Sequence, residues 1–218
     1  MKLFSTAYFP PIQYIAAIAE GMTLSPEKVI PSVIYIDIHE HYKKQSYRNR
    51  AVIATADGRM NLNVPVIHDG NIFATPVKDI RIDWSTDWLT RTERAIDAAY
   101  HTSAYYDYYR DDLFSILERK REYLVEMNTD ILRFFLEKTG VAADIRYTES
   151  YLETAEEDYR EVIHPKRKDT ILRDLGLEKP YFQVFAQKHG FMDNLSIMDL
   201  LFNEGPDSIV LLFKLALA

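Results

Sequence analysis

Residues 37–66 read DIHEHYKKQSYRNRAVIATADGRMNLNVPV, and they combine a polar stretch with a pattern typical of two short strands. The dipeptide Asp57-Gly58 predicts a β-hairpin, because a type I′ turn needs two central residues that accept positive φ. A two-residue loop at this position places Ile53 opposite Leu62. The alternation on either side of the turn then gives the hairpin one apolar face and one polar face.

The same stretch is basic where it approaches the hairpin. It contains Lys43, Lys44, Arg48 and Arg50, with no acidic residue among them. The hairpin fixes Arg50 on a strand, diagonal to Asn63, and a guanidinium fork suits phosphate or carboxylate better than an ammonium group does. These residues predict a site for a small anionic ligand. The alternative is a solvated connection whose charges face water.

Arg50 carries the most specific expectation. A strand position is stiffer than a loop position, so its guanidinium can be preorganised. We expect the side chain to be at least partly buried and hydrogen-bonded near the turn at residues 10–13.

Composition limits the classes of protein to which the chain can belong. The 218 residues are 47% hydrophobic, which is enough for the core of a single domain spanning residues 1–218. The net charge of −7 argues against a general nucleic-acid binder, so no nucleic-acid partner is expected. The absence of cysteine excludes disulfides and thiolate chemistry within these residues, and fits a reducing compartment.

The first 21 residues resemble a signal peptide, since Lys2 precedes an apolar run that ends in small residues. Ser5, Thr6 and the pair Pro10-Pro11 interrupt that run, which argues against a signal peptide. No apolar run approaches the length needed to span a membrane. The expected protein is therefore cytoplasmic and not inserted in a membrane.

A βαβ unit is predicted at the beginning of the chain. Residues 2–8 have the character of a strand, residues 12–19 form a helical stripe that ends at Gly21, and residues 29–38 are a β-branched run typical of a buried strand. In a right-handed crossover, Tyr8 and Gln13 lie at the carboxyl end of the first strand, where open α/β sheets bind ligands.

Helices dominate the middle of the chain. Their apolar periodicity and capping residues predict three successive helices, and further short elements follow them. The expected elements are a strand at 77–82, helices from residue 86 to 100, at 106–119 and at 122–138, a strand at 143–149, a solvated acidic segment at 149–161, a short helix at 169–176, a strand at 181–185 and a helix at 197–204 that is capped by Asn194 or Ser196. The expected fold class is α/β: a mixed sheet with the βαβ unit and the hairpin, covered by a helical layer.

Candidates for acid–base chemistry lie at two places in the chain. At the first, Asp37, His39 and His41 follow each other at spacings of two, so they share a face if the strand continues. They could ligate a metal, but polar residues at a strand end are the better interpretation, and no metal is expected. His101 is an alternative acid or base, or a hydrogen-bonded structural residue among tyrosines. Proton transfer is therefore assigned to Asp37, His39 or His101.

Several common signatures are missing. The sequence contains no P-loop, no G-x-G-x-x-G, no G-x-S-x-G and no H-E-x-x-H, so no cofactor is predicted. The tyrosines at 100–109 are interpreted as core residues, with a sugar-stacking wall as the alternative. Asp199 and Glu204 are expected to lie on the surface of the C-terminal helix.

Four stretches together resemble the WbqC-like protein family. They are Tyr8-Phe9-Pro10-Pro11-Ile12, then residues 44–50 (KQSYRNR) leading to residues 62–66 (LNVPV), then the Trp88 helix with residues 103–106 (SAYY), and residues 194–203 (NLSIMDLLFN). The positions that match the family motifs are Pro11, Lys44, Asn49, Arg50, Pro65, Ser196, Asp199 and Asn203. His39 and His41 are not part of the motif.

The resemblance implies a function in cell-surface polysaccharide biosynthesis. Members of the family occur in such gene clusters, and some carry the label of glycine or aminoacyl transferase. The implied activity is acyl or aminoacyl transfer to an activated sugar. Lys44, Arg48 and Arg50 would hold its diphosphate or carboxylate, and the sugar or nucleotide would be oriented by Tyr8, Pro11, Gln13, Asn49 and Asn63. The alternative is a non-catalytic module in envelope biogenesis that binds a nucleotide or a partner protein. The expected partner is a small anionic ligand, such as a nucleotide-sugar.

One region departs from the family pattern. Many members carry a loop with Gly and Tyr before the C-terminal helix, whereas residues 158–191 of this chain contain HPKRK and KPYFQVF. If this region shapes the substrate pocket, the chain is expected to take a different substrate.

Overall fold

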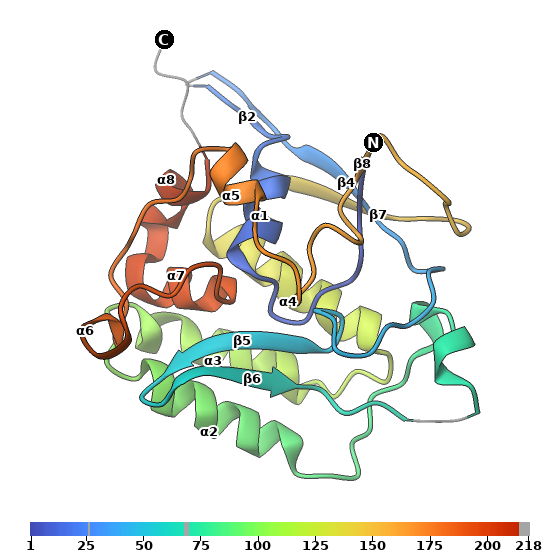
Figure 1. The fold of residues 1–218 in the computed structure, drawn as a ribbon, viewed down its shortest axis with the longest axis horizontal. Helices are drawn as coiled ribbons and strands as arrows, with labels where there is room; N and C mark the ends of the chain where they lie inside the picture. The colour runs from blue at the N-terminus through green and yellow to red at the C-terminus, as the bar shows by residue number, and fades with distance from the viewer. Residues whose placement is uncertain (26, 68–69, 214–218) are drawn as a thin grey trace.

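The structure is a computed structural model that describes residues 1–25, 27–67 and 70–213. Its centre is a four-stranded parallel sheet with the order β7-β4-β1-β8 (Figure 1). These strands are β1 (Lys2–Phe4), β4 (Ser32–Ile36), β7 (Ala143–Tyr147) and β8 (Glu157–Asp158). Because all four run the same way, their carboxyl ends lie at one edge of the sheet.

The predicted βαβ unit is confirmed. Helix α1 (Ile12–Ala19) connects β1 to its parallel neighbour β4, and every residue of this helix is buried. The β-branched run at 29–38 is not one strand, because Pro31 has no backbone N–H to donate. The chain forms β3 (Val29–Ile30) before Pro31, paired with β2 (Thr23–Leu24), and begins β4 after it.

The three central helices are also confirmed, and they form the expected helical layer (Figure 1). They are α2 (Trp88–Tyr100), α3 (Tyr106–Glu118) and α4 (Leu124–Lys138). Helix α4 contacts the sheet through a hydrogen bond: the hydroxyl of Tyr147 in β7 donates to Thr129 Oγ1 in α4 at 2.9 Å. Tyr100, Tyr106 and Tyr109 are buried, so the interpretation of these tyrosines as core is right for three of them.

The hairpin forms where it was predicted, but its register differs by two residues. Strands β5 (Arg50–Thr55) and β6 (Gly58–Asn63) pair Ala51 with Leu62, and they form a two-stranded sheet of their own instead of joining the parallel sheet. The turn residues are Ala56 and Asp57, and only Gly58 takes a positive φ, of 103°. A shift of two residues keeps each side chain on its predicted face.

Three other expectations are wrong. Residues 77–82 form a 3₁₀ turn (η2, Val77–Asp79) followed by isolated bridges, and residues 181–185 form no strand. The segment 149–161 is not simply solvated, because it contains β8 and the buried Arg160. Sequence composition missed both features because their partners lie far away in the chain: β8 pairs with β1, and Arg160 donates to Asp37.

The remaining elements follow the sheet in sequence. They are η1 (Ile72–Ala74), α5 (Ile171–Asp174), α6 (Ala186–His189), α7 (Ile197–Glu204), η3 (Gly205–Asp207) and α8 (Ser208–Leu212). Ser196, one of the two residues predicted to cap this helix, caps α7, since its side chain accepts a hydrogen bond from Met198 N. Asp199 on α7 is 1% exposed, so its expected place on the helix surface is wrong.

Candidate functional site

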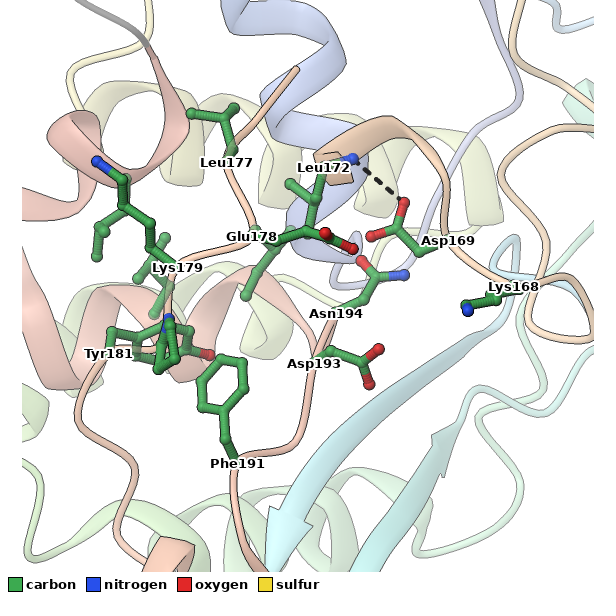
Figure 2. Close-up of a pocket in the computed structure, with 14 residues that line it drawn as sticks. Lys168, Asp169, Leu172, Leu177, Glu178, Lys179, Tyr181, Phe191, Asp193 and Asn194 are labelled. Atoms are coloured by element: carbon green, nitrogen blue, oxygen red, sulfur yellow. Dashed lines mark hydrogen bonds between the residues drawn. The ribbon is translucent and has the colours of Figure 1, made fainter. Parts of the chain in front are cut away.

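Two hollows bear on function. One is a largely apolar cavity of about 200 Å³ beside α1, α5 and α7, and none of the residues proposed for acid–base chemistry lines it (Figure 2). The other is a polar pocket of about 530 Å³ that His39 lines, just beyond the carboxyl end of β4. Open parallel sheets bind ligands at that edge, so the polar pocket is the candidate functional site.

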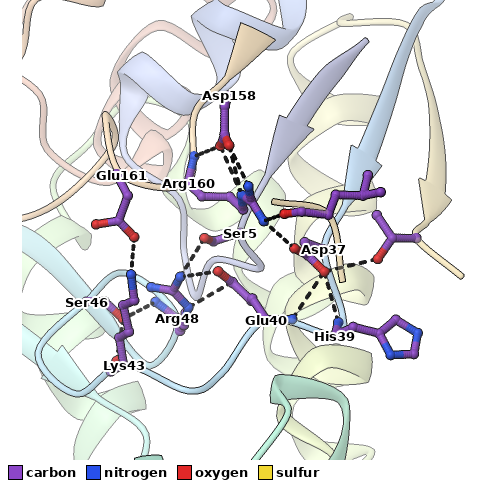
Figure 3. Close-up of polar contacts among 12 residues, drawn as sticks. Ser5, Asp37, His39, Glu40, Lys43, Ser46, Arg48, Asp158, Arg160 and Glu161 are labelled. Atoms are coloured by element: carbon purple, nitrogen blue, oxygen red, sulfur yellow. Dashed lines mark hydrogen bonds and ion pairs between the residues drawn. The ribbon is translucent and has the colours of Figure 1, made fainter. Parts of the chain in front are cut away.

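The carboxyl ends of the parallel strands meet in a buried polar network (Figure 3). Asp37, directly after β4, is fully buried. Its Oδ1 accepts hydrogen bonds from the backbone N–H groups of His39 and Glu40 and from Thr148 Oγ1, at 3.0, 3.1 and 3.1 Å. Its Oδ2 accepts from Arg160 Nη1 at 2.5 Å. Asp37 therefore shapes the loop that carries the two histidines.

Arg160 ties the end of β8 to the end of β4. The side chain is 6% exposed, and besides Asp37 it donates to both carboxylate oxygens of Asp158 and to the backbone carbonyls of Leu152 and Glu153. Partial burial works against ionisation of Asp158, yet the guanidinium of Arg160 holds the pKa of that carboxyl below its usual value. The strand ends are thus joined by charged groups that already have hydrogen-bond and ion-pair partners within the protein.

A second buried ion pair lies beside the first. Arg48 is 2% exposed, and its Nε donates to Glu40 Oε1 at 2.9 Å while Nη2 donates to Ser5 Oγ at 2.8 Å. Burial raises the pKa of Glu40, although Arg48 opposes the effect. Arg48 therefore links residues 5 and 40 next to the polar pocket, and its guanidinium, which was predicted to hold a ligand, pairs with the carboxylate of Glu40.

The wall of the polar pocket also contains a pair of charged side chains that are exposed to solvent. It is formed by His39, Glu40, His41, Lys43, Tyr151, Glu153, Asp158, Arg160 and Glu161. Lys43 pairs with Glu161, and both side chains are about half exposed. Partial burial works against ionisation of Glu161, but Lys43 holds the pKa of that carboxyl below its usual value. An exposed pair of this kind contributes about 0–1 kcal/mol, so an anionic ligand can replace Glu161 as the partner of Lys43.

The candidate acid–base residues are not brought together. His39 lines the pocket, and Asp37 lies behind it in the buried network. His101 is exposed at the end of α2, where its Nδ1 is 3.2 Å from the carbonyl of Asp97, and it is not among the residues that line the pocket. Of the three, His39 is the one placed to meet a ligand.

The predicted anion-binding residues are spread along the loop and the hairpin. Lys44 is exposed, with its ammonium 5.2 Å from the centre of the Phe73 ring. Asn49 donates to the carbonyl of Val64 and so closes the base of the hairpin. Arg50 is partly buried as expected, but its Nε donates to Asn63 Oδ1 at 3.0 Å instead of to the turn at residues 10–13. The residues that line the polar pocket include none of Lys44, Asn49, Arg50 and Asn63.

The turn after β1 is occupied by structural contacts. Tyr8 is fully buried, and its backbone N–H donates to the carbonyl of Tyr47 at 2.8 Å. Pro11 forms a bridge with Ser196, and the backbone N–H of Gln13 donates to Asn194 Oδ1 at 3.1 Å. The C-terminal segment 194–197, not Arg50, therefore holds this turn.

Sequence reasoning missed Lys43 and Arg160 as site residues. Lys43 was recognisable as part of the basic stretch, but nothing distinguished it from Lys44. Arg160 had a signal, because it is the one basic residue among six acidic residues in 149–161. A lone arginine in an acidic segment is a candidate for a buried ion pair.

Two searches of the described residues gave negative results. No group of three or more His, Asp and Glu side chains within 1–25, 27–67 and 70–213 is placed to hold a metal ion. In the same part of the chain, no helix has the length and apolar character that crossing a membrane requires.

Comparison with known families matches residues 6–178 to the WbqC-like protein family. This is most of the 218 residues and includes the parallel sheet edge with both ion pairs. The chain belongs to the WbqC-like protein family. The match ends within the divergent region at 158–191, so the resemblance at 194–203 lies beyond it in this WbqC-like chain. Neither the curated proteins nor the solved structures that were compared gave a match.

Proposed function

We propose that this WbqC-like protein is a cytoplasmic transferase that acts on an activated sugar in cell-surface polysaccharide biosynthesis. The reaction is acyl or aminoacyl transfer to an amine of the sugar. The observation that carries the proposal is the polar pocket at the carboxyl end of the parallel sheet, where His39 and Lys43 face the same space. Its volume of about 530 Å³ is within the range of small-molecule sites.

The pocket residues suggest a division of roles. Lys43 binds the phosphate of the activated sugar after exchanging Glu161 for it, since a surface ion pair is weak. His39 accepts the proton from the sugar amine as the nitrogen attacks the acyl carbonyl. The new amide bond forms while the bond from the acyl carbon to its leaving group breaks, and the leaving group departs with the bonding electrons. Asp37 acts as a positioning residue, because it fixes the backbone at His39.

The second candidate is a non-catalytic module that binds a nucleotide or a partner. One observation favours it: within the described residues, the His39 ring makes no hydrogen bond (Figure 3). Catalytic bases are usually oriented by a third group. A ligand could supply that partner in the transferase, whereas a binding module needs none.

Two neighbouring lysines provide the test of the site. Lys43 lines the pocket, and Lys44 is next to it in sequence but contacts Phe73. A panel of nucleotide-sugars is screened by thermal shift, and affinities of the hits are measured by calorimetry. We expect Lys43→Ala to weaken binding about tenfold or more, the range for a charged hydrogen bond, and Lys44→Ala to leave it within about twofold. Equal losses in the two variants contradict the assignment of the pocket.

A second experiment separates the two candidate functions. Purified protein is incubated with a bound amino-sugar nucleotide and activated acyl donors, and products are detected by mass spectrometry. For a transferase, His39→Asn removes turnover and retains binding, while the control His101→Asn keeps both. Binding without product from the wild-type protein and any donor supports the non-catalytic module.

A further inference from the structure

The apolar cavity beside α1, α5 and α7 takes no part in the chemistry proposed above. Ile12 of α1, Leu172 of α5 and Leu200 of α7 line it, together with Leu177 and Phe191 from the divergent region. Its volume is about 200 Å³. An apolar cavity of about 150 Å³ is large enough to hold benzene. The cavity can therefore accommodate an apolar group the size of a branched aliphatic or single-ring side chain.

The mouth of this cavity carries charges of both signs (Figure 2). Asp169, Glu178 and Asp193 supply carboxylates, of which Asp193 pairs with Arg59, and Lys168 and Lys179 supply ammonium groups. Burial raises the pKa of Asp169, and repulsion from Asp193 and Glu178 raises it further. An apolar ligand that also carries a positive and a negative group would therefore meet charges of opposite sign next to the cavity.

The walls are held in place by the protein itself. The hydroxyl of Tyr181 donates to the buried carboxylate of Asp199 at 2.5 Å, and Gln183 Nε2 donates to the same oxygen at 3.0 Å. Asp169 accepts the backbone N–H of Ile171 at 2.9 Å, which fixes the start of α5. A site on rigid walls binds with little loss of conformational freedom, so the cavity is preorganised for a ligand.

We propose that this cavity binds a free α-amino acid with an apolar side chain. The side chain occupies the space between Ile12, Leu172 and Leu200. The α-ammonium group lies against Glu178 and Asp193, and the α-carboxylate lies against Lys168. The inference goes beyond the proposed function, because this cavity shares no lining residue with the polar pocket, and the binding is measurable without any turnover.

Calorimetry with matched probes tests each part of the ligand. L-Leucine is compared with 4-methylpentanoate, which lacks the ammonium group, with 3-methylbutylamine, which lacks the carboxylate, and with glycine, which lacks the side chain. We expect L-leucine or L-phenylalanine to bind at least about tenfold more tightly than each truncated probe. The acid and the amine each lose a charged contact, and glycine loses the burial of an apolar side chain. If 4-methylpentanoate or the amine binds as tightly as L-leucine, the proposed amino acid is wrong.

Two variants locate the binding. Glu178→Gln changes an exposed side chain, so it keeps the fold, and we expect it to weaken L-leucine binding several-fold without weakening 4-methylpentanoate binding; Glu126→Gln on α4 is the control. Leu172→Trp fills the cavity, and we expect it to abolish L-leucine binding in protein whose far-UV circular dichroism is unchanged. L-Leucine binding that is the same in Glu178→Gln and wild type overturns the inference.

Nucleotide-sugar binding to the same preparations separates this inference from the proposed function. If the nucleotide-sugar binds through Lys43 and no apolar amino acid binds, the inference about the cavity fails alone. If L-leucine binds and no nucleotide-sugar does, the cavity assignment holds and the proposed function fails.

Discussion

Asp37 and Asp199 are both buried carboxylates, but their surroundings are opposite. Asp37, at the carboxyl end of the sheet, faces the guanidinium of Arg160 and two backbone N–H groups. Asp199, behind the wall of the apolar cavity, is held by the neutral donors Tyr181 and Gln183. Burial raises the pKa of Asp199 to about 6, although these hydrogen bonds oppose the effect.

The difference shows that burial alone does not determine what a carboxylate contributes. A buried charge is tolerated when an opposite charge and hydrogen bonds compensate for lost hydration, and it shifts its protonation when they do not. The sheet edge is therefore a region of fixed charges that can position a polar ligand. The C-terminal region instead gains its order partly from a carboxyl group that titrates in the mildly acidic range.

The largest expected effect comes from breaking the charged pair. Arg160→Met leaves Asp37 buried without its cation, and we expect the free energy of unfolding to fall by about 3–5 kcal/mol. Chemical denaturation measures it. The control is Arg146→Met, because Arg146 pairs with Asp144 at the surface of β7, where an ion pair contributes about 0–1 kcal/mol. Similar losses in the two variants contradict the contrast between buried and exposed arginines.

The second effect is a pH dependence that belongs to Asp199. The unfolded carboxyl loses its proton near pH 3.9, while the folded one keeps it to about pH 6. Between these values the unfolded state binds fewer protons, so the free energy of unfolding falls as the pH rises. A shift of about two units corresponds to about 2–3 kcal/mol.

The variant Asp199→Asn removes the titrating carboxyl group and so isolates its contribution to the pH dependence of the free energy of unfolding. We expect denaturation curves from pH 4 to 7 to show the wild type losing about 2–3 kcal/mol relative to Asp199→Asn, with the loss complete just above pH 6. Asparagine can still accept the hydrogen bond from Tyr181 through its carbonyl oxygen. A constant difference between the two proteins across this range means that Asp199 does not titrate as described.

The smallest effect is expected at Arg50. Its guanidinium makes one described hydrogen bond, to Asn63 on the neighbouring strand. Arg50→Lys keeps the charge and loses the fork, and we expect it to change the free energy of unfolding by less than about 1 kcal/mol. It is expected to leave nucleotide-sugar affinity unchanged, because Arg50 does not line the polar pocket. A loss of nucleotide-sugar affinity with an unchanged melting temperature would show that Arg50 contacts the ligand.

The sequence predicted the elements of the fold well where local signals were sufficient. Apolar periodicity located α1 to α4, and the cap of α7, Ser196, was one of the two residues predicted for that position. The hairpin shows the limit, since its faces were right and its register was not. Thr55 Oγ1 accepts the backbone N–H of Asp57 at 3.3 Å, which favours a turn with positive φ at Gly58 alone. A side chain outside the two-residue motif thus contributed to the choice of turn.

The candidate site was only partly predictable because its partners are far apart in sequence. Asp37 and His39 were selected from local spacing, and the structure places His39 in the pocket. The partner of Asp37 is Arg160, which is 123 residues away. Lys43 and Lys44 cannot be distinguished without knowing that one faces Glu161 and the other Phe73. Side-chain direction in a loop depends on tertiary contacts that no local pattern contains.

The assignment of the polar pocket as the ligand site is tested most directly by NMR of the histidine side chains. The six histidines include two that line the pocket, His39 and His41, and two at other sites, His101 and His189. Their ring signals are assigned by single His→Asn substitutions and followed during titration with the nucleotide-sugar that gives the largest thermal shift. We predict that the signals of His39 and His41 move in proportion to ligand bound and that those of His101 and His189 stay in place. Movement of His101 or His189 with static signals from His39 and His41 would show that the ligand binds elsewhere.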